Sequence, residues 1–348
     1  MVEFAGWEMP LLYRGIVEEH RHTREKCSVF DVSHMGRIEV SGADAESLLE
    51  FLCTRRLGDM TPGQSRYSHL CNERGGILDD VIVSRYETHW LIVCNASNRE
   101  KVLDWVRRHA QGRAVRIDDI TEGTAMVAIQ GPLAMAQAAR VLPVPLGGLR
   151  RYHFVAGEFM GMRYTVFRSG YTGEDGVEVI LPAQAAPAGW QFLLQPPDEF
   201  EPSPIRPAGL GARDTLRIEA GMPLYGHELH EGVDSLQAGL AWCVDLSKDF
   251  CGADAMRRLQ EAGLPRRLVG LELAGRRTAR PGSAVVRNRR AIGEVTSGTL
   301  APTLDKSIAM AYVASEFAAP GTDVRVKIRD HEAEAAVVAL PFYKRATP

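Results

Sequence analysis

The first 263 residues alternate between segments with helical and with strand spacing of their apolar positions. In Ala43–Thr54 the apolar residues cluster on one side of a helix, whereas Gly76–Ser84 and Thr88–Cys94 are short apolar runs around a polar turn, as in a β-hairpin. The other predicted helices are Arg14–Cys27, Ser97–His109 with Ser97 as its N-cap, a short one from Pro132, Gln184–Leu194, Ala208–Ala220 and Gly252–Ala262. The other predicted strands lie near Val115 and at Met126–Gln130, Met162–Arg168 and Val177–Leu181.

The pattern changes after Gly263, where the apolar runs become short and closely spaced and are separated by Gly, Pro and Asp. Six strands are predicted there: Leu268–Leu273, Ser283–Val286, Gly293–Thr296, Ile308–Val313, Asp323–Ile328 and Ala333–Val338. Such spacing is typical of a small sandwich or barrel. We therefore predict an α+β chain with a boundary between a region 1–263 and an all-β region 264–348.

Composition narrows the class of protein. The 348 residues are 45% hydrophobic and 24% charged, with a net charge of −3, which is the mix of a soluble globular protein and gives no general case for nucleic-acid binding. No stretch is long and apolar enough to span a membrane, and the first residues do not resemble a secretory signal. The six cysteines form no C-x-x-C pair, so we expect reduced core cysteines in a cytoplasmic protein. Gln195–Pro204 is expected to be a Pro-rich surface loop.

Two adjacent carboxylates, Asp79 and Asp80, interrupt the apolar strand Gly76–Ser84. Neighbouring side chains on a strand point to opposite faces, so one of the two is expected to face an interior or a cavity. A buried carboxylate needs a partner and often has a shifted pKa, as at active sites. The alternatives are an edge strand with two solvated carboxylates, or a structural carboxylate that accepts from turn N–H groups.

A second candidate segment combines a glycine-rich turn with a charged strand residue. Arg168–Gly176 contains three glycines that allow a tight loop, and Glu178 follows on the strand face that Val177 and Val179 do not occupy. Glu178 could accept hydrogen bonds from an amino-bearing heterocycle, or it could be an ordinary surface residue beside a hairpin turn.

The helix Ala208–Ala220 places Arg213 and Arg217 on one side. Either arginine could hold a ligand carboxylate in bidentate fashion, or pair internally with Asp214 or Glu219. No metal site is expected at His227 and His230, because their spacing is not that of a zinc-binding H-E-x-x-H helix.

Taken together, these segments resemble the glycine cleavage T-protein family of folate-binding aminomethyltransferases. The resemblance runs nearly end to end and in the family's order. It rests on Phe4–Pro10, Phe30–Gly36, the Gly-Gly-Ile-Leu-Asp-Asp strand, Ser169–Gly176, the Gly-Leu-Gly-Ala-Arg-Asp helix, Lys248–Phe250, Gly293–Gly298 and Pro341–Tyr343.

The resemblance implies a three-domain cloverleaf, with two interleaved α+β folate-binding domains in 1–263 and a C-terminal β-barrel in 264–348. It also implies transfer of a one-carbon unit from aminomethyl-lipoyl H-protein to tetrahydrofolate, with release of ammonia. By position in the family's motifs, Asp80 is the catalytic residue. The implied contacts to tetrahydrofolate, the acceptor substrate, are Tyr67, Asn95, Tyr171, Glu178, Arg213 and, by a looser match, Tyr343. H-protein is the implied partner, and its acidic surface would meet basic clusters at Arg21–Lys26, Arg266–Arg267 or Arg287–Arg290.

The chain departs from the family's pattern at Ser235–Gln237, where Thr-Pro followed by an aromatic residue is more typical, at Ala301, where serine is common, and at its start, where a short segment precedes the motif in relatives. Two alternatives stay open. One is another tetrahydrofolate-dependent one-carbon transferase or demethylase. The other is a non-catalytic folate-binding maintenance protein, although the Lys-Gly-Cys-Tyr-x-Gly-Gln-Glu motif of that relative is absent.

Overall fold

The computed structural model describes residues 1–159, 161–196 and 203–346. The chain forms two compact units. Unit 1 contains Met1–Glu50, Leu57–Tyr67 and Val81–Arg213, and unit 2 contains Phe51–Arg56, Ser68–Asp80 and Asp214–Pro348. Residues close in sequence therefore belong to different units in several places.

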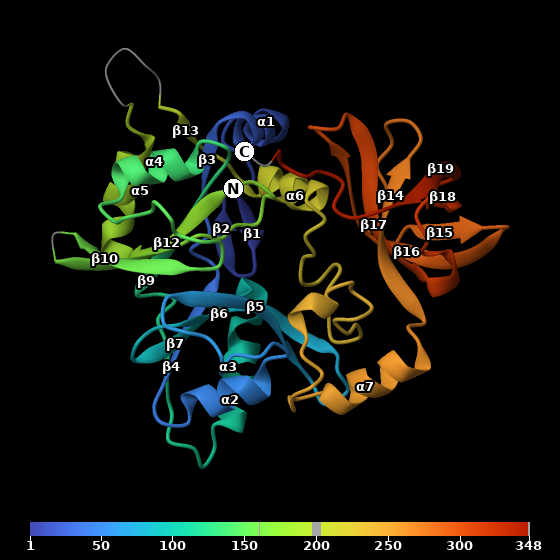
Figure 1. Cartoon of the computed structure of the whole chain (residues 1–348). Coiled ribbons are helices and arrows are strands. Elements are labelled where there is room, and N and C mark those ends of the chain that lie inside the picture. Colours follow the sequence, from blue (N-terminus) through green and yellow to red (C-terminus); the bar gives the residue numbers. More distant parts are fainter. Residues whose placement is uncertain (160, 197–202, 347–348) are drawn as a thin grey trace. The chain divides into compact units, whose positions relative to one another are not determined.

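A six-stranded sheet of unit 1 has the order β10-β11-β12-β9-β3-β13 (Figure 1). Its strands are β3 (Cys27–Asp31), β9 (Thr124–Gln130), β10 (Phe154–Phe159), β11 (Met162–Phe167), β12 (Gly176–Pro182) and β13 (Ile205–Pro207). Buried side chains of these strands form one core with α4 (Ala134–Val141) and α5 (Ala186–Leu194). Helix α1 (Ile16–Glu25) precedes β3 directly.

A five-stranded sheet has the order β5-β6-β7-β4-β8. Its strands are β4 (Gly36–Ser41), β5 (Gln64–Cys71), β6 (Ile77–Arg85), β7 (His89–Cys94) and β8 (Arg116–Asp119), with helices α2 (Ala45–Leu52) and α3 (Arg99–His109) in the same stretch of chain and a small hairpin, β1 (Val2–Phe4) and β2 (Trp7–Met9), at the start. Strands β6 and β7 are antiparallel, with Ile82 opposite Val93, which confirms the predicted hairpin. Both β5 and β6 continue from one unit into the other.

Unit 2 contains a closed six-stranded barrel with the order β14-β17-β16-β15-β18-β19 (Figure 1). Its strands are β14 (Arg266–Leu273), β15 (Ala284–Arg287), β16 (Arg290–Ala301), β17 (Lys306–Ala314), β18 (Asp323–Ile328) and β19 (His331–Val338). Small and β-branched side chains fill the interior, among them Val285, Val295 and Ala311. The α+β class with a C-terminal barrel is therefore confirmed. The predicted boundary after Gly263 lies shortly before β14.

Helix α6 (Leu210–Glu219) begins in unit 1 and ends in unit 2, and α7 (Ala253–Ala262) precedes the barrel. Their ends lie within two residues of the predicted ones. The predicted N-cap at Ser97 is wrong, because a 3-10 turn over Ala96–Asn98 precedes α3 and Asn98 occupies the cap position. The predicted helix Arg14–Cys27 is too long, since Cys27 already begins β3.

All six cysteines lie among the described residues, are buried and form no disulfide bond. Among the described residues, no helix is long and apolar enough to cross a membrane. Residues 197–202 of the predicted Pro-rich loop lie outside the described residues.

Candidate functional site

The two adjacent carboxylates of strand β6, those of Asp79 and Asp80, lie in different surroundings. Asp79 is fully buried, whereas Asp80 is partly exposed. This difference follows from the alternation of side chains along a strand. The expectation that one carboxylate faces an interior is confirmed, and the other, Asp80, is the one that solvent reaches.

A tight turn fixes the start of β6. The Asn72 side-chain oxygen accepts hydrogen bonds from the N–H groups of Arg74 and Gly76, both at 3.0 Å. A Cβ on Gly76 would lie 1.9 Å from the carbonyl oxygen of Glu231, so only glycine fits there. The N–H of Ile77 donates to the Val233 carbonyl at 2.9 Å. These contacts hold the backbone that leads to Asp80.

Two neutral groups lie within electrostatic reach of Asp80. Burial raises the pKa of Tyr225, with further upward contributions from the carboxylates of Glu231, Asp79 and Asp80. Burial raises the pKa of the Cys243 thiol to about 12, although Arg55 opposes this shift and Asp80 adds to it. At neutral pH the phenol and the thiol therefore stay protonated, and neither is a ready nucleophile. Asp80, in contrast, is partly exposed, and it is the residue that the sequence analysis predicted to be catalytic.

In unit 1, Tyr171, Glu178 and Arg213 lie together and form what we call the Arg213 cluster. The Arg213 guanidinium carbon lies 4.9 Å from the centre of the Tyr171 ring. Glu178 is buried, at 7% exposure, and accepts a hydrogen bond of 2.5 Å from the hydroxyl of Ser169. Its neighbours Val177 and Val179 face the core of the sheet, as the alternation predicted. The alternative of a surface glutamate is wrong.

The Arg213 guanidinium has unusual surroundings for a buried charge. Its Nη1 atom is buried and has no hydrogen-bond partner among the described residues, and no ion pair to a described carboxylate is present. Burial lowers the pKa of Arg213, while nearby Glu178 and Tyr171 act in the opposite direction. Because a buried unpaired donor is unfavourable, this nitrogen is an open position for an acceptor on a ligand. Arg213 also lines a narrow crevice with Met9, Pro10, Phe30, Asp31, Ala208, Gly209 and Leu210.

The loop that carries Tyr171 is held by buried polar contacts. Arg24 forms an ion pair with Glu174 at 2.8 Å, and both side chains are almost fully buried. Gln130 donates to the Ser169 carbonyl at 3.0 Å and accepts from the Thr172 hydroxyl at 2.9 Å. The Tyr171 ring is therefore set by a fixed loop, as a pre-organised binding site requires.

His34 is a residue of this region that the sequence reasoning did not single out as a contact. It is 3% exposed, and its Nδ1 atom has no hydrogen-bond partner within the described part of the chain. Burial, together with the positive charges of Arg213 and Arg37, lowers its pKa to about 3. His34 is thus a neutral imidazole with a free polar atom. In the sequence, the feature that could have identified His34 is its position within the Phe30–Gly36 motif.

Arg217 has the internal role that was one of the alternatives for this helix. Its guanidinium pairs with Asp214 at 2.9 Å and with buried Glu228 at 2.7 Å, and it donates to the Ser297 hydroxyl at 2.8 Å. Glu228 also accepts from Thr296 at 2.6 Å. All three guanidinium nitrogens of Arg217 are therefore engaged within the protein. Of the two arginines on this helix, Arg213 is the one that remains available to a ligand.

The remaining predicted contacts lie on other elements. Tyr67 is on β5 and Asn95 follows β7, both in unit 1 and both partly exposed. Tyr343 is in unit 2, where its N–H donates to the Glu219 carbonyl at 2.8 Å. Their predicted roles stay predictions. No group of His, Cys, Asp or Glu side chains that could hold a metal ion occurs among the described residues.

The departure at Ser235–Gln237 faces the interior of unit 2. Ser235 is fully buried, with its hydroxyl 2.6 Å from Nδ1 of His69. Gln237 donates to Asp234 and accepts from Arg266 at 2.8 Å. These contacts give the three residues a packing role within unit 2.

Comparisons with known proteins agree with this architecture. The family profile "GCVT N-terminal domain" matches residues 1–248, and "Glycine cleavage T-protein C-terminal barrel domain" matches residues 266–344. The chain is 45% identical to an aminomethyltransferase of Rubrobacter xylanophilus, over 99% of this chain and 91% of the relative. It is 43% identical to one of Moorella thermoacetica, over 99% and 94%.

A solved structure gives the same result. The crystal structure of the glycine cleavage system aminomethyltransferase T from Bartonella henselae matches 99% of this chain and 94% of its own, with a TM-score of 0.92 and 35% sequence identity. The two family profiles and the sequence identity to these relatives over 99% of the chain together assign its family. It belongs to the glycine cleavage T-protein family of aminomethyltransferases.

Proposed function

We propose that the chain moves the one-carbon unit of an aminomethyl group, carried on the lipoyl arm of H-protein, to tetrahydrofolate. The carbon–nitrogen and carbon–sulfur bonds of the aminomethyl group break, and the carbon joins two nitrogens of tetrahydrofolate. The two hydrogens that leave those nitrogens go to ammonia and to the lipoyl thiol. The products are methylenetetrahydrofolate, ammonia and dihydrolipoyl H-protein, and the reaction takes place in the cytoplasm.

The observation that carries the folate assignment is the Arg213 cluster. It offers a flat aromatic ring on Tyr171, a buried carboxylate on Glu178 and an open guanidinium nitrogen on Arg213. A pterin has a flat ring, an amino-bearing edge that donates to a carboxylate, and carbonyl and ring-nitrogen acceptors for a guanidinium. We assign ring contact to Tyr171, the aminopyrimidine edge to Glu178 and a pterin acceptor to Arg213. Tyr67 and Asn95 are further proposed contacts, and Tyr343 is a third.

Asp80 is the proposed acid–base residue. The attack of a folate nitrogen on the aminomethyl carbon requires that a proton be held and then passed on, and a carboxylate can do this when it is accessible. Asp80 is the accessible member of the pair, and the turn at Asn72 and Gly76 fixes its strand. Fully buried Asp79 suits a structural role.

For H-protein docking, the basic cluster Arg287–Arg290 is the best of the three candidates. Arg289 and Arg290 are exposed at the β15–β16 turn. In the other clusters, Arg24 is buried in its pair with Glu174, and Arg266 is engaged with Gln237 and with the Gly232 carbonyl. An exposed basic turn would attract an acidic partner and speed their encounter.

A transfer assay tests the proposal. Purified chain is mixed with aminomethyl-loaded H-protein and tetrahydrofolate, and methylenetetrahydrofolate and ammonia are measured. Parallel reactions replace the donor with dimethylglycine or sarcosine. Product from loaded H-protein alone supports the proposal, product from the methylated amines instead would make the chain a demethylase, and tetrahydrofolate binding without product from any donor would make it a binding protein.

A further inference from the structure

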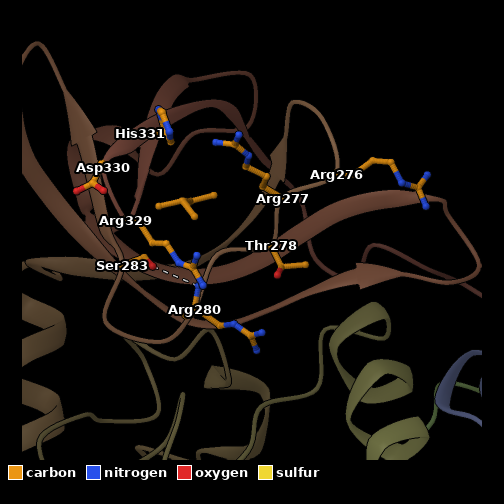
Figure 2. A pocket seen from close by; sticks show the side chains of 9 residues that line it. Arg276, Arg277, Thr278, Arg280, Ser283, Arg329, Asp330 and His331 are labelled. Atoms are coloured by element: carbon orange, nitrogen blue, oxygen red, sulfur yellow. Dashed lines mark hydrogen bonds between the residues drawn. The ribbon is translucent and has the colours of Figure 1, made fainter.

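The barrel has a cavity of about 660 Å³ at its connecting loops. None of the residues that line it has a role in the proposed aminomethyl transfer. It lies between the loop after β14 and the turn that joins β18 to β19 (Figure 2). The lining residues are Arg276, Arg277, Thr278, Arg280, Ser283, Ile328, Arg329, Asp330 and His331. This volume is in the range of sites that hold small molecules.

The cavity is strongly basic. With histidine counted as neutral, four arginines against one aspartate give its lining a formal charge of +3, although the whole chain carries −3. Arg276 is paired with Asp305 at 2.8 Å and extends away from the other lining arginines in Figure 2. Within the described residues, the guanidinium groups of Arg277, Arg280 and Arg329 form no ion pair. Three cations from separate positions of the lining are thus outside any ion pair of the described residues, and the Asp330 carboxylate of the lining offsets only one of their charges.

The loop after β14, which carries Arg277 and Arg280, is fixed. Ala279 is fully buried in the barrel core, and a Cβ on Gly298 of β16 would lie 2.5 Å from its carbonyl oxygen. The Ser307 hydroxyl donates to the Arg277 carbonyl at 2.8 Å. The Gly282 N–H donates to the Val295 carbonyl at 2.9 Å. Arg277 and Arg280 therefore extend from a loop that is held against the barrel wall, which lowers the entropy lost when they bind a ligand, while Arg329 extends from the turn between β18 and β19.

From these observations we infer that the barrel cavity binds a small anion with two or more phosphate or carboxylate groups. Like charges held around one hollow repel each other, and an anion among them removes that repulsion. The planar guanidinium fork matches phosphate and carboxylate oxygens in bidentate fashion. Three separate guanidiniums favour a ligand with several charged groups over a single anion. The hydroxyls of Thr278 and Ser283 provide additional donors in the lining.

Calorimetric titration of the full chain at low ionic strength tests this inference, with tripolyphosphate, citrate and acetate as probes. We expect one site per chain for tripolyphosphate, citrate or both, and no measurable binding of acetate. The ratio of the two affinities identifies whether phosphate or carboxylate is preferred. Affinity should fall as salt is added, since the site is open to solvent.

Variants locate the site. Arg277→Ala and Arg329→Ala should each weaken binding by at least about tenfold, which corresponds to about 1.4 kcal/mol. Arg258→Ala removes one exposed arginine of α7 and should leave the affinity unchanged. All three side chains are exposed, so the fold should tolerate these changes, and circular dichroism verifies this. Absence of binding at millimolar probe, or equal losses in all three variants, would overturn the inference.

Discussion

Replacement of Arg213 by methionine separates a ligand contact from a structural charge. In the free protein the substitution removes the contact with Tyr171, which is worth about 0.5–2 kcal/mol. It also removes a buried guanidinium nitrogen without a partner, whose desolvation costs about 1–3 kcal/mol. The two effects have opposite signs and similar size. We therefore expect the free energy of unfolding to change by no more than about 1 kcal/mol.

The effect on the ligand should be much larger. A hydrogen bond to a charged group contributes about 1.5–3 kcal/mol, so Arg213→Met should weaken tetrahydrofolate binding by about 10- to 100-fold. At a concentration of about 100 times the wild-type Kd, tetrahydrofolate stabilises the wild type by about 2.7 kcal/mol. The same concentration should stabilise the variant by only about 0.4–1.4 kcal/mol.

Arg217→Met is the matched control, because Arg217 lies one helical turn further along α6 and is bonded to Glu228. Breaking that buried pair should cost about 3–5 kcal/mol in the free protein and leave the ligand-induced gain unchanged. The assay is urea unfolding of the wild type and both variants, with and without tetrahydrofolate. The reasoning is refuted if Arg213→Met destabilises the free protein as much as Arg217→Met does and keeps the full ligand-induced gain.

Three further predictions address catalysis, pH and docking. Asp80→Asn should retain the fold and tetrahydrofolate binding but lower turnover in the transfer assay by at least about 100-fold, and near-normal turnover would assign the proton transfer to another group. Burial lowers the pKa of both His34 and His69 to about 3, so between pH 3 and 6.5 only the unfolded chain takes up these protons and stability is lost as pH falls through this window. Near pH 5 each should contribute a slope of about 1.4 kcal/mol per pH unit, and His69→Gln should reduce the measured slope of unfolding free energy by that amount; an unchanged slope contradicts the assignment. Association with H-protein should weaken as salt is added, and Arg289→Glu should slow association in a stopped-flow measurement; rates that do not depend on salt exclude electrostatic docking.

The sequence predicted those parts of the fold that depend on local spacing. The alternation along β6 separated Asp79 from Asp80, because a strand period of two is strict. The six barrel strands were found because turn residues bound each of them. Strand β5 was missed because its sequence, Gln-Ser-Arg-Tyr-Ser-His-Leu-Cys, contains few strand-forming residues and is kept extended by its neighbours in the sheet.

The division of roles between Arg213 and Arg217 could not be read from the sequence. Both lie on one side of the same helix, and the contact that distinguishes them is Glu228, which lies in a loop after the helix, together with Ser297 of the barrel. Likewise, the free Nδ1 atom of His34 depends on packing that local sequence does not encode. The order of the family's motifs identified more of the candidate residues than the chemistry of single residues did, because that order reflects the whole fold.

The complete burial of the cysteines has a practical consequence for experiments in solution. Burial raises the pKa of the Cys27 and Cys243 thiols to about 12, and that of Cys71 well above its usual value, so in the folded chain these three offer almost no thiolate to an alkylating reagent, and the other three are also buried. Alkylation must then wait for local opening, and its rate at each cysteine reports how often that region opens. For the same reason, one cysteine introduced on the surface should take up a fluorophore selectively while all six native cysteines remain in place.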